Sequence, residues 1–306
     1  MSARLAVASA APEWCVPDCL SSVEQRCRKL INPSLSVDSG IADQSAAAEM
    51  AAGYHLQAGG RRIRARLALD ASFRLGLTAR TAVVLAATCE LLHNASLVHD
   101  DLQDRDSTRR GVNTVWKNFG DNTAICTGDL LLSAAYASLA ELDDLTYLPQ
   151  MLALVHRRTA AAIQGQSADL AHRTSAVKNT DTYLKIVAGK SGAMLSLPIE
   201  LALLAAGQGQ WMDNACAAAE AFAIGYQIAD DLDDIDKDAA PETAAQALNL
   251  ALLIQQRDQS PLATVRQQCI AMARHHLNLA TDGAALLPQQ SGNLLAQLAT
   301  ELNSQW

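Results

Sequence analysis

The sequence has few aromatic residues and few prolines, and no segment of it reads as a linker. Aromatic residues make up 4% of the 306 positions, eight residues are proline, and 50% are apolar. This composition is typical of helices. Because no Pro/Ser/Gly-rich stretch or change of composition divides the chain, we predict one large domain over residues 18–306, after a flexible N-terminal segment over residues 1–17.

Cysteine motifs, a positive net charge and long apolar runs are also missing. The seven cysteines show no CxxC or CxH spacing, and their odd number fits free thiols in a reducing compartment. The formal net charge of −8 argues against general affinity for nucleic acid or anionic membranes. No charge-free apolar run is long enough to span a bilayer, and the N-terminus makes a poor signal peptide. We therefore predict a cytoplasmic protein without a transmembrane segment.

Apolar residues recur with helical spacing along the chain, whereas no segment alternates as a strand would. The predicted fold class is therefore all-α, without strands. The predicted helices span residues 18–32, 40–57, 62–75, 79–103, 112–118, 123–141, 145–171, 179–205, 209–235, 243–257, 261–281 and 289–303.

The most informative stretch, ELLHNASLVHDDLQDRDSTRRG, lies at the end of a predicted helix. At about 100° per residue, Asp100 and Asp104 lie about 40° apart on this helix, with Asp101 beside them. Carboxylates this close repel one another and raise each other's pKa unless cations bind them. Hard divalent ions prefer such oxygens, and magnesium is the ion that we expect. Arg109 and Arg110 follow, which suits a ligand that carries both metal and phosphate.

A second acidic group, in GYQIADDLDDIDKD, repeats this pattern after another apolar helical run. It contains Asp230, Asp231 and Asp234, and Gln227 falls about 60° from Asp230 on the same face. A single group of this kind is usually a solvated helix end. Two DDxxD groups in one chain, the second embedded in apolar sequence, are more specific, so we predict that both bind metal.

Basic residues that could bind an anion cluster after Gly59 and Gly60, which end one predicted helix. The next helix begins with several arginines, of which Arg61 and Arg64 are expected to share a face. Such a cluster is more often a solvated face, although guanidinium groups and free N–H groups at a helix start also favour diphosphate.

Two further positions have two interpretations each. His93 lies two helical turns before Asp100, so it either lines the same cavity or is a hydrogen-bonded core histidine. Lys190, which stands beside Ser191 as a lone charge in an apolar run, either caps the preceding glycine or reaches a phosphate.

Together these segments resemble the polyprenyl synthetase family, the trans-isoprenyl diphosphate synthases that include farnesyl and geranylgeranyl diphosphate synthases. The similarity covers about residues 55–238. Their order and spacing make the resemblance specific. The motifs are GGRRIR at 59–64, ELLHNASLVHDDLQD at 90–104, RRG at 109–111, GD at 128–129, GQSAD at 165–169, KS at 190–191 and QIADDLDD at 227–234.

The resemblance implies an all-α, single-domain helical bundle of the isoprenoid synthase type around a central cavity, usually paired as a homodimer. It also implies head-to-tail prenyl transfer, in which an allylic diphosphate loses diphosphate and the resulting cation alkylates isopentenyl diphosphate. About three magnesium ions per active site, held by two facing aspartate groups, would neutralise the leaving diphosphate.

By position in the family motifs, each candidate residue receives a role. The metal ligands are Asp100, Asp101, Asp104, Asp230, Asp231 and Asp234. The residues that hold the allylic diphosphate are Arg109, Lys190, Ser191 and Gln227. The residues that hold isopentenyl diphosphate are Arg61, Arg64, His93 and Arg110. The catalytic set comprises Asp100, Asp101, Asp104, Lys190, Gln227, Asp230 and Asp231.

The sequence departs from the family pattern at three places. Arg61 replaces a lysine, and the region after Asp234 is short and contains Lys237 as its only lysine. The C-terminal end, ELNSQW, lacks the basic residues that many family members have there. These departures leave open a non-catalytic or regulatory subunit of a prenyl synthase complex. A terpene cyclase fits less well because it needs no second diphosphate site. We expect the active synthase, since a chain without activity would not retain six carboxylates that are costly to bury without metal.

Small residues before the first acidic group predict a product longer than the farnesyl length. Ala95 and Ser96 stand where farnesyl-producing relatives commonly have an aromatic side chain. The space that they leave for the growing chain predicts a product of about twenty carbons. Tyr136 or another bulky residue on a neighbouring helix could still close the tunnel that holds this chain.

Overall fold

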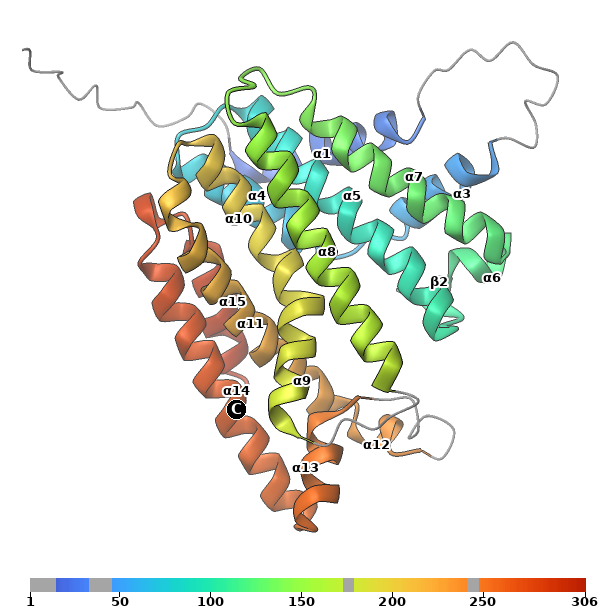
Figure 1. Cartoon of the computed structure of the whole chain (residues 1–306), viewed down its shortest axis with the longest axis vertical. Coiled ribbons are helices and arrows are strands. Elements are labelled where there is room, and N and C mark those ends of the chain that lie inside the picture. The colour runs from blue at the N-terminus through green and yellow to red at the C-terminus, as the bar shows by residue number, and fades with distance from the viewer. Residues whose placement is uncertain (1–14, 33–45, 173–178, 241–247) are drawn as a thin grey trace, which may run out of the picture. The chain divides into compact units, whose positions relative to one another are not determined.

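The computed structural model describes residues 15–32, 46–172, 179–240 and 248–306 (Figure 1). Helices form almost all of the regular structure in these ranges, which confirms the predicted fold class. The α-helices are Val16–Leu30 (α1), Ala47–Gln57 (α3), Ile63–Arg74 (α4), Ala79–Asp104 (α5), Val115–Phe119 (α6), Asp121–Leu139 (α7), Leu148–His172 (α8), Thr180–Val187 (α9), Ala193–Ala205 (α10), Met212–Asp233 (α11), Ile235–Asp238 (α12), Leu250–Asp258 (α13), Leu262–Ala285 (α14) and Asn293–Asn303 (α15). The other elements are the strands Thr108–Arg109 (β1) and Val112–Asn113 (β2), the π-helical turn Ala188–Gly192 (η1), and the 3₁₀ turns Gly209–Trp211 (η2) and Pro288–Gln290 (η3).

The chain divides into two compact units, Met1–Leu145 (unit 1) and Thr146–Trp306 (unit 2). The single domain expected from residue 18 onward stays a prediction. Most of the expected flexible N-terminal segment lies outside the described residues, and α1 begins at Val16, slightly earlier than predicted. The first residues of the helices predicted over 40–57 and 243–257 also lie outside the described part of the chain.

Helix α5 is the central element of unit 1 and ends in the first acidic group. It runs beside α7 and also contacts α4 and α1 (Figure 1). Thr78 caps its start, because the side-chain oxygen accepts a hydrogen bond from the backbone N–H of Thr81. Leu85 and Leu91 are fully buried. Core packing therefore fixes α5 along most of its length and so positions its last turn.

A short hairpin follows α5 where we predicted no strand. Antiparallel pairing of β1 with β2 leaves Arg110 and Gly111 as a two-residue turn. Their φ values are 53° and 81°, and a type I′ hairpin turn requires positive φ at both positions. The predicted helix over 112–118 is therefore wrong at its start, and α6 begins at Val115.

Helix α11 ends in the second acidic group and contacts α14, α10 and η1 within unit 2 (Figure 1). The core beside its last turns includes Tyr183 of α9, Ile228 of α11 and Ile254 of α13. We predicted one helix over 209–235. The structure instead has the 3₁₀ turn η2 first, and α11 ends at Asp233.

The π-helical turn η1 interrupts another helix that we predicted as continuous, over residues 179–205. It contains Lys190 and Ser191 and separates α9 from α10. A π-helical turn admits one more residue per turn than an α-helix, is rare, and frequently occurs at functional sites. The π-helical turn at this position therefore favours a functional role for Lys190.

Two helical stretches, Ala79–Asp104 and Thr180–Ala205, are long and apolar enough to cross a membrane by length and composition alone. In their most apolar windows, 72% and 78% of the residues are buried within the protein. Core helices of water-exposed proteins pass the same test, so these two stretches are weak evidence for a membrane span.

All seven cysteines belong to the described residues, and none forms a disulfide. This agrees with the free thiols expected from their spacing.

Candidate functional site

The first aspartate cluster consists of Asp100, Asp101 and Asp104 in the last turn of α5. Asp101 is fully buried, and its Oδ1 accepts a hydrogen bond from Nε of Arg109 at 2.5 Å. Its Oδ2 is also buried and accepts no hydrogen bond from any described residue. Burial raises the pKa of Asp101 to about 6, and the guanidinium of Arg109 opposes this shift. A cation bound to this buried oxygen would therefore be stabilising.

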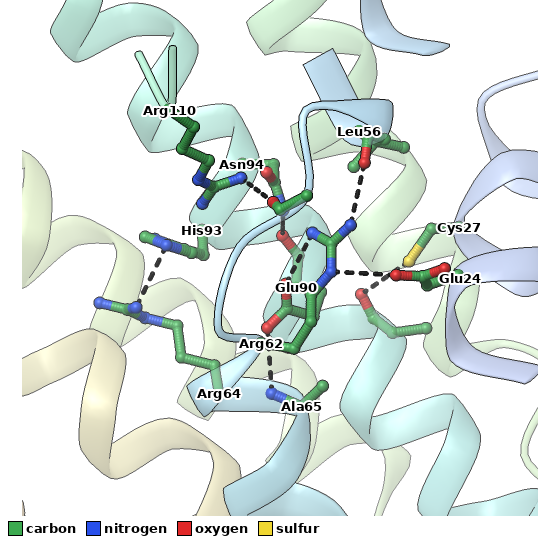
Figure 2. A network of polar contacts seen from close by, with 12 residues as sticks. Glu24, Cys27, Leu56, Arg62, Arg64, Ala65, Glu90, His93, Asn94 and Arg110 are labelled. Carbon is green, nitrogen blue, oxygen red and sulfur yellow. Dashed lines mark hydrogen bonds and ion pairs between the residues drawn. The ribbon is translucent and has the colours of Figure 1, made fainter. Parts of the chain in front are cut away.

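His93 lies among guanidinium groups in unit 1. Nη1 of Arg64 is 3.2 Å from Nε2 of His93 (Figure 2). Burial, together with the charges of Arg64, Arg110 and Arg109, lowers the pKa of His93 well below its usual value, so the ring is neutral. Because arginine can only donate, Nε2 is the acceptor and the ring proton is on Nδ1. The crowded positive charges favour an anion at this place.

Arg110 lies against the turn before α4, with its guanidinium donating to the carbonyl oxygen of Gly59 (Figure 2). A Cβ added to Gly60, whose φ is 128°, would be 2.7 Å from the guanidinium carbon of Arg110. The positive φ favours glycine at this position, because any other side chain would be strained there. Burial and the charges of Arg62 and Arg109 lower the pKa of Arg110. A bound anion would relieve this crowding.

Arg62 has a structural role that the sequence did not reveal. Its guanidinium binds Oε1 of Glu24 at 3.2 Å and the carbonyl oxygen of Leu56 at 2.9 Å, and lies 3.5 Å from Oε2 of Glu90 (Figure 2). Glu90 is 3% exposed and also accepts from the backbone N–H of Ala65 at 3.1 Å. These contacts tie the start of α4 to α1, α3 and α5. A carboxylate within an apolar helical run, Glu90, was the available signal for such a buried partner.

Arg61 does not share a helix face with Arg64, which corrects the expectation from the sequence. Helix α4 begins at Ile63, and Arg62 is its N-cap with a left-handed backbone (φ 50°). Arg61 is therefore exposed in the loop before the helix. The cause is the chain turn that starts at Gly59 and continues to Arg62.

The second aspartate cluster consists of Asp230, Asp231 and Asp234 at the end of α11. Asp231 is 4% exposed, and its Oδ1 accepts a hydrogen bond from Nε2 of Gln227 at 2.9 Å. Its Oδ2 accepts from the hydroxyl of Tyr183 and from the backbone N–H of Leu250, both at 2.7 Å. Burial raises the pKa of Asp231 to about 6, although these hydrogen bonds oppose the shift. Both oxygens thus have protein donors.

Asn249 extends this network and was also missed by the sequence reading. Its Oδ1 accepts from two backbone N–H groups and caps α13. Its Nδ2 donates to the carbonyl oxygen of Asp231 at 2.7 Å and to Asp238 at 2.9 Å. An asparagine just before an apolar helical run is a readable cap signal, whereas its contacts with α11 and α12 depend on the fold.

Lys190 precedes the second aspartate cluster in the sequence and Lys237 follows it, and the two lysines differ in their surroundings. Nζ of Lys190 is 2.8 Å from Oδ2 of Asp169, and both side chains are partly buried. Ser191 follows it in η1. Lys237 is 71% exposed and lies 3.4 Å from Asp234. Lys190 is therefore held by a carboxylate of α8, while Lys237 is a solvent-exposed ion-pair partner.

Within the described residues, no three His, Cys, Asp or Glu side chains are arranged to hold a metal ion by themselves. Magnesium is usually bound by one or two carboxylates together with phosphate oxygens and water. The aspartate clusters supply oxygen donors of this type, and the unpartnered Oδ2 of Asp101 fits a cation. The side chains present therefore suit magnesium that arrives with a phosphate ligand.

The structure brings several of the expected site residues together within each unit. In unit 1, Arg109 links the environment of His93 to the first aspartate cluster, because it pairs with Asp101 and lowers the pKa of His93. In unit 2, Gln227 contacts the second aspartate cluster directly. Arg61 is exposed in the loop before α4 and takes no part in the contacts described above.

Comparisons with known proteins agree with these observations. The family model described as Polyprenyl synthetase matches residues 46–245. A (2E,6E)-farnesyl diphosphate synthase of Mycobacterium tuberculosis is 35% identical over 174 residues, which cover 56% of this chain and 48% of that enzyme. A farnesyl diphosphate synthase of Geobacillus stearothermophilus is 33% identical over 253 residues, covering 76% and 83%. The match thus spans about half the length of the Mycobacterium enzyme and most of the Geobacillus enzyme.

Solved structures share the helical fold. The geranylgeranyl pyrophosphate synthetase of Geoglobus acetivorans superposes with a TM-score of 0.78 at 23% identity, over 94% of this chain and 98% of that chain. A decaprenyl diphosphate synthase of Rhodobacter capsulatus gives 0.77 at 21% identity, over 95% and 98%. At this identity the likeness establishes the fold alone.

Proposed function

The chain belongs to the polyprenyl synthetase family, and we propose that it is a trans-prenyl diphosphate synthase that joins an allylic diphosphate to isopentenyl diphosphate with magnesium. The observation that carries the proposal lies in unit 1. There, Arg109 connects carboxylates suited to a hard cation with guanidinium groups suited to a diphosphate. A substrate that carries magnesium on its phosphate oxygens matches this pairing of charges.

Isopentenyl diphosphate is assigned to basic side chains of unit 1. They are His93 with its neighbours Arg64 and Arg110, and the exposed Arg61. The neutral ring accepts a hydrogen bond from Arg64, which fixes the direction of one guanidinium, and Arg110 is held against the backbone of Gly59. Donors that are already oriented lose less entropy when the diphosphate binds. Arg61 is exposed and has the most freedom of the four.

The allylic diphosphate is assigned to cations and polar groups near the aspartate clusters. These are Arg109, Lys190, Ser191 and Gln227, with metal ligands drawn from Asp100, Asp101, Asp104, Asp230, Asp231 and Asp234. About three bound magnesium ions would neutralise the leaving diphosphate and favour ionisation of the allylic bond. By this assignment, Arg109 would stabilise negative charge that develops on the diphosphate, and Lys190 would have the same role. Direct ligation by Asp231 requires that one of its present hydrogen bonds be exchanged.

We propose a product of about twenty carbons, because the side chains of α5 before the first aspartate cluster are small. Ala95 is 4% exposed, and Thr88 and Leu92 are buried on the turns before it. A growing chain that extends from the metal site along α5 meets no aromatic ring at Ala95. The relatives and solved structures named above include both farnesyl and geranylgeranyl synthases.

The rival proposal is a non-catalytic or regulatory subunit, and the observation that favours it is the scarcity of lysine after the second aspartate cluster. Lys237 is exposed, and residues 241–247 of this region lie outside the described part of the chain. The names of the matched relatives support the active synthase instead.

Incubation of the purified protein with magnesium, isopentenyl diphosphate and each allylic primer separates the alternatives. We expect prenyl diphosphates whose formation requires both substrates. Activity that appears only after addition of a separately active synthase would favour the subunit, and release of a hydrocarbon would favour the cyclase. We further propose that the protein is cytoplasmic and forms a homodimer. Light scattering of the purified protein tests whether it is a dimer.

A further inference from the structure

The π-helical turn η1 lies against the backbone of α8 in unit 2 (Figure 1). A Cβ added to Gly165 of α8 would be 2.8 Å from Cα of Lys190 and 2.9 Å from the carbonyl carbon of Gly189. These atoms belong to the backbone and cannot rotate away as a flexible side chain can. Glycine at position 165 is therefore what allows the two segments to approach this closely.

The same face of α8 also holds the end of the Lys190 side chain. Asp169 follows Gly165 by one helical turn, and its Oδ2 is 2.8 Å from Nζ of Lys190. The two side chains are 17% and 31% exposed, so water screens the pair only in part. One helix thus contacts both the backbone and the ammonium group of this lysine.

We propose that Gly165 and Asp169 are positioning residues for Lys190 that set where its ammonium group meets the allylic diphosphate. The inference rests on the proposed function, which assigns Lys190 to that diphosphate. The extra residue in the π-helical turn gives the lysine a direction that an uninterrupted α-helix would not give. Asp169 orients the ammonium group through this ion pair, and the more highly charged diphosphate then attracts it in competition with the carboxylate.

Gly165 and Gly189 offer a matched pair of substitutions. A Cβ on Gly189 would have no neighbour closer than 3.6 Å, which is an ordinary contact. Gly165→Ala and Gly189→Ala each add one methyl group where α8 and η1 meet, but only the first forces the backbones apart. We expect Gly165→Ala to lower kcat by about tenfold to a hundredfold, since small displacements of a binding group are costly, and Gly189→Ala to stay within about twofold of wild type.

Asp169→Asn tests the contact with the ammonium group and does not depend on whether Gly165→Ala folds. We expect kcat to fall about tenfold because the ammonium loses its orientation. Affinity for inorganic pyrophosphate with magnesium, measured by calorimetry, should stay equal or increase, because a competing carboxylate is gone. Asp169→Glu should recover part of kcat. A merely structural role would instead reduce kcat and pyrophosphate affinity together.

The wild-type protein is measured first, with the same calorimetry and with both prenyl substrates. Absence of pyrophosphate binding and of product in the wild type would overturn the proposed function itself. If the wild type is active, equal kcat values in the two glycine variants would overturn the role of Gly165. A kcat at the wild-type level in Asp169→Asn would overturn the role of Asp169.

Discussion

The two aspartate clusters have the same DDxxD spacing, yet their middle aspartates are held in different ways. Asp101 is held by a charged group, the guanidinium of Arg109, and keeps one buried oxygen without a hydrogen bond from the described residues. Asp231 is held by three neutral donors that engage both oxygens. Burial raises the pKa of each to about 6. The motif alone therefore does not predict which carboxylate oxygens already accept hydrogen bonds from the protein.

The partners also differ in their distance along the chain. Arg109 lies eight residues after Asp101, in the hairpin that directly follows α5. Tyr183 lies 48 residues before Asp231 and belongs to α9, and Leu250 lies 19 residues after it at the start of α13. The first cluster is thus completed by local structure, whereas the second also fixes the packing of three helices. Substitutions in the two clusters should reveal this difference.

Loss of the first aspartate in either cluster should have the largest effect on activity. We expect Asp100→Ala and Asp230→Ala each to lower kcat at least about 100-fold while the thermal unfolding temperature changes little, because both remove a proposed magnesium ligand. Asp231→Ala should in addition destabilise the protein by about 3 kcal/mol, since it removes the acceptor of buried donors. Steady-state kinetics in magnesium and thermal unfolding measure both effects.

Either ligand variant would contradict the metal assignment if it kept more than about a tenth of the wild-type rate. Equal stability of Asp231→Ala and Asp230→Ala would contradict the structural role of Asp231.

The pH dependence of stability should come next in size. The pKa of Asp231 is raised from 3.8 to about 6 in the folded protein. The folded state therefore binds this proton more tightly than the unfolded state. The resulting contribution to the free energy of unfolding is complete below about pH 4 and is lost as the pH rises through about 6. A shift of two pKa units corresponds to about 3 kcal/mol.

Urea unfolding of magnesium-free wild type and Asp231→Asn measures this term, because the variant cannot titrate at that position. The stability of wild type relative to the variant should fall by up to about 3 kcal/mol between pH 4 and pH 7. Asp101→Asn should show a change in the same direction. A stability difference that is independent of pH would show that the proton is not held as the burial of Asp231 requires.

Replacing Arg110 should have a smaller and more selective effect. Its φ of 53° in the hairpin turn favours asparagine over arginine, and the strain is about 1 kcal/mol. Arg110→Asn should therefore keep or raise the unfolding temperature. It should raise the KM for isopentenyl diphosphate about tenfold, because a charged hydrogen-bond donor is lost, and leave the allylic KM almost unchanged.

Arg105→Asn is the matched control for relief of backbone strain at an arginine with positive φ. Arg105 also has a positive φ, 58°, but it is exposed and pairs with Asp121 on the surface. The control should relieve similar strain without changing either KM. A rise in the allylic KM of Arg110→Asn would reverse the proposed roles of Arg109 and Arg110.

The helices that carry both clusters could be predicted from the sequence, because long apolar runs with helical spacing determine them. Helix α5, expected over 79–103, spans Ala79–Asp104. The contacts that complete the clusters could not be predicted in the same way. The hydrogen bond from Tyr183 to Asp231 needs α9 to pack on α11, and the ion pair between Lys190 and Asp169 needs α8 to lie against η1. Such pairs depend on tertiary packing, which a local pattern does not encode.

Two turns near the site differ from the sequence-based prediction. Arg110 and Gly111 form a two-residue hairpin turn between two strands of two residues each, where only helices were expected. Gly59 and Gly60 were recognised as a helix end, but the left-handed conformation of Arg62, which removes Arg61 from the helix, was not expected. A non-glycine residue in that conformation is uncommon, and here Arg62 is retained in it by Glu24 and Leu56.

Substitutions five residues before the first aspartate of each cluster should have the smallest effect on the total rate. They also give the sharpest comparison of the two clusters. In α5 this residue is Ala95, and in α11 it is Gly225. A Cβ on Gly225 would lie 2.7 Å from Cγ of Leu277 in α14, so this side of α11 is closely packed within unit 2. Gly225→Ala should thus destabilise the protein by about 1–3 kcal/mol without changing product length.

Ala95→Phe should instead shorten the product, because a ring beneath the first aspartate cluster resists further growth of the chain. We expect the proposed geranylgeranyl product of wild type to give way to the farnesyl product, with total turnover within about threefold of wild type, since no proposed ligand or substrate contact is removed. Chromatography of the dephosphorylated products measures the distribution for wild type and both variants. If wild type already stops at the farnesyl length and Ala95→Phe leaves the distribution unchanged, the floor of the tunnel lies elsewhere than on α5. A shorter product from Gly225→Ala would move that floor to α11.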